Sequence, residues 1–235
     1  MRVTCLLLAL ALFAIHCTEP VSEIREVAVS FETYPFSDPD PVPDPDAAIY
    51  PYFKFEGYSK YSSPTEWNVV ELENEHIKVQ IMPGIGGKVW GAVEKSTGNE
   101  FIYANDVVKF RNIALRGPWT SGGIEFNVTL VGHTAAVSTP VDYKLRQNDD
   151  GSVSCFVGGL DLISRTRWET EIRLEPGKAY FTTTTRWTNP TALFQPYYQW
   201  SNAAYAASDD LQIFFPGTHY LGHDGQAHTW PVDHE

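Results

Sequence analysis

The sequence predicts an all-β protein on three grounds, all drawn from the sequence after the leader. Residues 76–82 alternate polar and apolar side chains strictly, which puts Ile77, Val79 and Ile81 on one face of a strand. Short runs of this kind are separated by turn-forming segments such as residues 96–99 (STGN), which is typical of hairpins. No helical periodicity of useful length follows the first eighteen residues. Together these patterns favour an antiparallel β-sandwich or barrel.

The individual strands follow from the same patterns. The runs that we expect to form strands are 69–73, 76–82, 88–93, 100–103, 152–157, 167–174 and 179–187. Glycine and proline in residues 83–87 (PGIGG) interrupt the pattern, and residues 175–178 (EPGK) have the composition of a turn. The aromatic-rich residues 49–58 are expected to lie along the body as an edge strand or belt.

The first eighteen residues predict an exported protein. Arg2 precedes an apolar run from Leu6 to Ile15 that is too short to span a bilayer permanently. Cys17 directly after this run resembles the attachment cysteine of a lipoprotein. We therefore expect a cell-envelope lipoprotein, or a secreted or periplasmic protein, whose contact with a membrane would be limited to that lipid. The alternative is an ordinary cleaved signal in which Cys17 has no role.

Residues 19–48 are expected to be a solvated spacer between this leader and a domain spanning residues 49–235. Residues 19–46 contain eight of the 29 acidic residues of the chain and one basic residue. Asp and Pro alternate in residues 38–46, which favours an extended backbone. The prolines also exclude the tight loop that a calcium site would need.

Charge and cysteine content exclude several classes of protein. The formal net charge of −12 argues against a nucleic-acid partner, because phosphates require a basic face. Cys155 is the only cysteine after the leader, so it cannot form an internal disulfide, and we expect it in the core.

Residues 116–133 contain the strongest candidate for a functional site. Arg116, Trp119, Glu125, Asn127 and His133 stand among several glycines, which favours a loop rather than a regular strand. An indole ring beside these polar groups suits a sugar, since the ring packs on its C–H face and the polar groups satisfy its hydroxyls. A structural turn with a buried salt bridge explains the same residues equally well.

The last forty residues add further candidates. Strand alternation puts Tyr198, Trp200 and Asn202 on one face. His219, His223 and His228 follow, with Trp230 close behind, but their spacing among glycines and a proline fits no helix-borne metal ligands. We therefore expect loop histidines that donate hydrogen bonds or carry protons, and no metal.

Several motifs occur together in the order known from one family. They are residues 83–87 (PGIGG) before 88–90 (KVW), residues 111–127 (RNIALRGPWTSGGIEFN), residues 132–134 (GHT) and residues 197–203 (YYQWSNA). From about Tyr50 the chain resembles a bacterial family of galactose-mutarotase-like domains of unknown function, often followed by tetratricopeptide repeats. The resemblance implies an antiparallel β-supersandwich of galactose-mutarotase type whose concave face holds carbohydrate. Such domains use more strands than this chain supplies, so we expect the domain to be incomplete at the C-terminus.

These observations favour a carbohydrate-active protein, either a glycosidase or an epimerase, that needs no cofactor. Glu125 would be the acid/base and His133 or His219 its proton partner, with Arg116 favouring the ionised carboxylate. The residues expected to bind an oligo- or polysaccharide are Arg116, Trp119, Asn127, Tyr198, Trp200, Asn202, His223 and Trp230. The alternatives are a non-catalytic carbohydrate-binding module and a structural domain that presents downstream repeats.

Overall fold

The computed structural model describes residues 21–42, 52–113, 117–128, 133, 135–214, 216–222 and 224–230. These residues confirm the all-β prediction, because the one helical segment among them is a 3₁₀ turn, η1 (Ala135–Val137). The chain divides into two compact units, one up to Tyr205 and one from Ala206 onward. The domain expected over residues 49–235 stays a prediction.

The larger sheet of the first unit contains eight strands in the order β14-β9-β4-β3-β2-β1-β6, with β5 paired to β4. The pairs are antiparallel except for β1 and β6, which run parallel. The strands are β1 (Glu23–Tyr34), β2 (Ser63–Glu73), β3 (Ile77–Met82), β4 (Lys88–Glu94), β5 (Glu100–Ile102), β6 (Val107–Lys109), β9 (Ile124–Asn127) and β14 (Trp200–Ala203).

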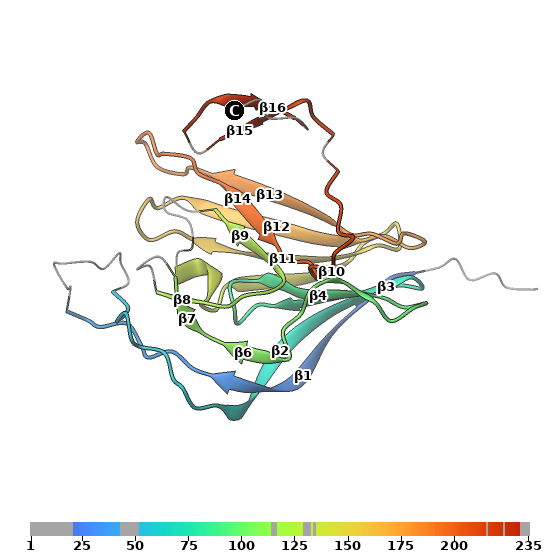
Figure 1. The fold of residues 1–235 in the computed structure, drawn as a ribbon, viewed down its shortest axis with the longest axis horizontal. Helices are drawn as coiled ribbons and strands as arrows, with labels where there is room; N and C mark the ends of the chain where they lie inside the picture. The colour runs from blue at the N-terminus through green and yellow to red at the C-terminus, as the bar shows by residue number, and fades with distance from the viewer. Residues whose placement is uncertain are drawn as a thin grey trace, which may run out of the picture. The chain divides into compact units, whose positions relative to one another are not determined.

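A smaller antiparallel sheet packs against the larger one (Figure 1). Its strands, in spatial order, are β10 (Asp142–Gln147), β11 (Val153–Leu160), β12 (Arg167–Leu174) and β13 (Thr182–Thr188). One apolar cluster joins the two sheets: Leu72, Val79 and Phe126 of the larger sheet meet Cys155 and Ile172 of the smaller. The buried Cys155 confirms the core position expected for it.

The opposite face of the larger sheet is also partly covered. Val69, Met82 and Trp90 form a second buried cluster there with Val108 and Phe110. Alternation explains the two clusters, because neighbouring residues such as Val69 and Val70 point to opposite faces of β2. A short ladder of β7 (Arg111–Asn112) with β8 (Pro118–Trp119) completes the described strands of this unit.

The expected spacer over residues 19–48 is wrong for residues 23–34, which form β1. This strand pairs with β2 over eleven residues, from Glu23 opposite Glu73 to Thr33 opposite Ser63. Val27, Val29 and Phe31 alternate with small or polar residues and pack against the second cluster. That alternation is typical of a strand, but the acidic composition of the segment favoured a spacer.

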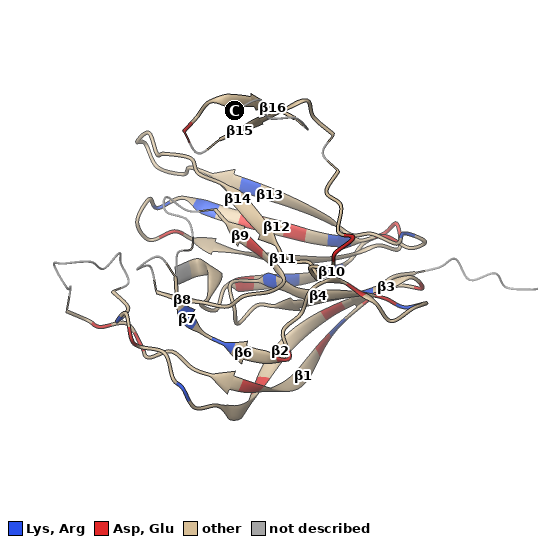
Figure 2. Cartoon of the chain, in the orientation of Figure 1, with Lys and Arg blue, Asp and Glu red and all other residues tan. Residues whose placement is uncertain are grey.

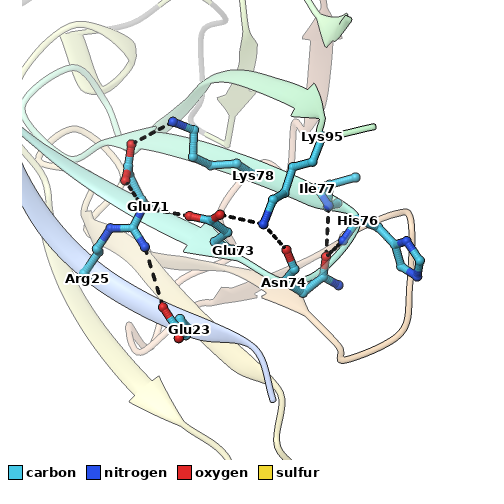
Figure 3. A network of polar contacts seen from close by, with 9 residues as sticks. All are labelled: Glu23, Arg25, Glu71, Glu73, Asn74, His76, Ile77, Lys78 and Lys95. Atoms are coloured by element: carbon cyan, nitrogen blue, oxygen red, sulfur yellow. Dashed lines mark hydrogen bonds and ion pairs between the residues drawn. The ribbon is translucent and has the colours of Figure 1, made fainter. Parts of the chain in front are cut away.

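Arg25 ties β1 to β2 at the end of the sheet shown in Figure 3. Its Nη2 atom donates hydrogen bonds to Glu71 at 2.6 Å and to Glu73 at 2.7 Å. Lys95 Nζ lies 2.7 Å from Glu73, and Lys78 Nζ lies 3.4 Å from Glu71. Hydrogen bonds from Lys95 and Arg25 lower the pKa of Glu73. Burial opposes ionisation of Glu71, but the hydrogen bond from Gln80 and the nearby cations lower its pKa overall.

The second unit contains one hairpin, β15 (His219–Leu221) with β16 (Ala227–Thr229). Tyr220 stacks on His228 with ring centroids 5.1 Å apart, and His228 Nε2 lies 3.6 Å from Asp224.

Candidate functional site

The alternation of β4, β9 and β14 brings polar side chains together on one face of the larger sheet. Val89 is paired with Ile124, and Asn202 with Glu125, so Lys88, Glu125 and Asn202 form a row across three strands. Trp200 is paired with Asn127 in the next row. Because Phe126 points into the core between the sheets, this polar face is turned away from the smaller sheet.

Glu125 is the centre of this cluster and is 3% exposed. Its Oε2 atom accepts a hydrogen bond from Trp119 Nε1 at 2.6 Å. Its Oε1 atom accepts hydrogen bonds from Asn202 Nδ2 at 2.8 Å and from Asn127 Nδ2 at 3.1 Å. Both carboxylate oxygens are therefore occupied by neutral donors from the protein, which fixes the orientation of the side chain.

His133 stands beside this carboxylate and is held by its backbone. Its amide donates to Asn127 Oδ1 at 2.7 Å, and its φ of 52° lies in the left-handed region that non-glycine residues seldom adopt. The ring nitrogen Nδ1 lies 3.1 Å from Glu125 Oε1, an ion-pair distance for a protonated ring, but the contact lacks hydrogen-bond geometry. The imidazole therefore faces Glu125 without being locked to it.

Aromatic rings surround the imidazole. Trp200 and Trp119 meet it edge to face, with centroids 4.7 Å and 6.2 Å away. Tyr198, which precedes β14 and is exposed, has its ring 6.3 Å from that of Trp200. Asn202 is exposed, and Trp119, His133 and Trp200 are half-buried. The buried carboxylate is thus covered by rings that still reach solvent.

Lys88 belongs to this site, although sequence reasoning did not select it. Lys88 is 1% exposed, and its ammonium group donates to Thr120 O at 2.9 Å and to Thr120 Oγ1 at 3.2 Å. Burial lowers the pKa of Lys88 to about 8, while the charge of Glu125 acts to raise it. The signal in the sequence was a lysine at the start of β4, directly before the apolar residues 89–93.

The other predicted residues belong to the second unit or lie outside the described residues. His219 and Trp230 lie in the second unit. Arg116, His223 and Cys17, together with the leader 1–18, lie outside the described residues. The expected Arg116–Glu125 pair therefore stays a prediction, and Lys88 is the cation for which an electrostatic effect of Glu125 is seen.

The described residues contain no group of three or more His, Cys, Asp or Glu side chains placed to hold a metal ion. No helix among them is long and apolar enough to cross a membrane. Acidic and basic residues are interspersed over the strands (Figure 2).

The arrangement suits recognition of a polar molecule with apolar faces. Indole and phenol rings offer stacking surfaces, and the Asn202 amide offers a donor and an acceptor at the rim. Because Nδ1 of the imidazole faces the Glu125 carboxylate, Nε2 is the ring nitrogen that could exchange a proton with a bound group.

The fold and site define a β-sandwich protein with a buried carboxylate beneath an aromatic rim. Residues 44–235 match the family model described as a domain of unknown function (DUF5107). The chain belongs to this family, whose matched region begins after β1. Its structure is similar to the crystal structure of a TPR-domain containing protein from Parabacteroides distasonis ATCC 8503, with a TM-score of 0.72 and 26% sequence identity. That similarity covers 80% of this chain and 33% of the other, so the chain spans about a third of that protein.

Proposed function

We propose that this chain binds a carbohydrate over Glu125 and acts on it by proton transfer through His133. The observation that carries the proposal is the convergence of two indole rings, an imidazole and two amides on one buried carboxylate. A saccharide presents C–H faces to such rings and hydroxyls to such amides. The galactose-mutarotase resemblance supports the same class of ligand, and the leader supports action outside the cytoplasm.

The two members of the Glu125–His133 pair have different roles in this proposal. The carboxylate of Glu125 is buried with its oxygens already engaged, so it supplies a fixed acidic group 3.1 Å from Nδ1 of the imidazole. The imidazole accepts a proton at Nε2 from one hydroxyl of the sugar and donates it from Nε2 to another oxygen of the same sugar. The acid/base assigned to Glu125 from the sequence thus passes to His133.

A non-catalytic binding module is the second candidate, and the occupied oxygens of Glu125 favour it. A carboxylate that accepts three hydrogen bonds from protein groups serves equally well to hold a rigid binding surface.

The test is binding to an array of plant and microbial oligosaccharides, followed by assay of turnover of any glycan that binds. Trp200→Ala is expected to weaken binding at least tenfold, whereas the control Tyr61→Ala, which removes an 85% exposed aromatic ring, should leave it unchanged. His133→Gln should abolish turnover with binding retained, and Glu125→Gln should shift its pH profile. Binding without turnover by the unmodified protein would support the second candidate, and absence of any binding would favour a structural domain.

A further inference from the structure

The segment 117–123, which we call the site loop, carries Trp119 and is pressed closely against β4. A Cβ atom on Gly123 would lie 2.1 Å from the carbonyl oxygen of Val89, and the φ of Gly123 is +67°. The Gly123 amide donates to Tyr103 O at 2.8 Å, and Asn105 Nδ2 donates to Ser121 O at 2.6 Å. The loop is thus held from the side of residues 103–105.

Lys88 holds the same loop from beneath. Besides its two hydrogen bonds to Thr120, its Nζ atom lies 3.5 Å from Ser121 O. Within the described residues, it is the one buried lysine or arginine. A buried ammonium group is costly unless hydrogen bonds and an opposite charge compensate it, and Lys88 has both.

The opposite charge is supplied by Glu125, next to Lys88 in the row across β4 and β9. Glu125 in turn accepts the hydrogen bond from Trp119, which is the neighbour of Thr120 in the site loop. Lys88 and Glu125 therefore fix consecutive residues of the loop from two strands.

We propose that Lys88 is a positioning residue that locks the site loop, and so Trp119, over the sheet and balances the charge of Glu125. The inference deepens the proposed function because it concerns the same site, but it can be tested without a ligand.

Hydrogen exchange of the site-loop amides tests the proposal directly. Lys88→Met removes the charge and the donors while keeping an unbranched side chain, and is expected to raise exchange of residues 117–123 at least tenfold at pH 7. The control is Lys144→Met, which removes an exposed lysine on β10 and should change nothing in the loop. Unchanged exchange in Lys88→Met would overturn the proposal.

NMR titration of the lysine side chains gives a second test that the wild-type protein can supply. Lys88 is expected to titrate near pH 8, and at a lower pH in Glu125→Gln, because the stabilising carboxylate is gone. The same pKa of Lys88 in both proteins would refute the charge pairing. If the exchange and titration results are as expected but no glycan binds, only the proposed function would be wrong.

Discussion

Two carboxylates on the same face of the larger sheet, Glu71 and Glu125, are both nearly buried but have different partners. Glu71 is bonded to Arg25 and Gln80 and lies near Lys78, and the two cations are 41% and 36% exposed. Glu125 is bonded to an indole and two amides, and its cation Lys88 is buried. The first arrangement fastens β1 to the sheet, where water can replace lost partners. The second fixes the geometry of a site, where water cannot do so as easily.

The largest expected effect is a difference in the free energy of unfolding between variants of these two carboxylates. Glu125→Ala should cost about 3–5 kcal/mol, because Lys88 and three neutral donors lose a buried partner. Glu71→Ala should cost about 1–2 kcal/mol, because Arg25 and Lys78 can turn to solvent. Urea denaturation of both variants measures the difference. Equal losses would show that burial of the partners does not distinguish the two networks.

A smaller loss of stability is expected from a substitution at Gly123, whose backbone lies close to β4 beneath the site. Gly123→Ala should cost about 2–4 kcal/mol, because its Cβ would collide with the Val89 carbonyl in addition to straining a positive φ. Gly98→Ala is the matched control: its φ is +77°, and nothing lies within 4 Å of an added Cβ. That variant should show the backbone strain alone, about 1–2 kcal/mol. Thermal unfolding measures the loss of stability in both variants. Equal losses would contradict the close approach of Gly123 to the Val89 carbonyl.

The smallest effect on stability concerns the contacts of Arg25 with Glu71 and Glu73, and it depends on pH. The pKa values of Glu71 and Glu73 are lowered in the folded chain, so their contribution to stability is complete above about pH 4.5 and is lost as pH falls through the lowered values. Arg25→Ala should cost about 1 kcal/mol at pH 7 and make the loss in acid shallower. Denaturation curves between pH 2 and 7 measure this. An unchanged slope would assign the acid sensitivity to other groups.

The strands of the core could be predicted because their signals are local. Ile77, Val79 and Ile81 alternate over six residues of β3, and all three are fully buried. β1 carried the same signal in Val27, Val29 and Phe31, but the charges around it supported the interpretation as a spacer. Its pairing with β2, about forty residues later, has no local counterpart in the sequence.

The sequence by itself determined that the chain is all-β. It also determined which side chains in the segments 116–133 and 197–203 could serve a site, because turn formation and strand alternation depend on only a few neighbouring residues. Only the tertiary structure decided that Asn202 meets Glu125 across 77 residues and that His133 lies between Trp119 and Trp200. It also decided that Lys88 lies beneath the loop of Trp119. Strand order and register set these contacts, and they depend on the packing of the whole sheet rather than on any short segment of chain.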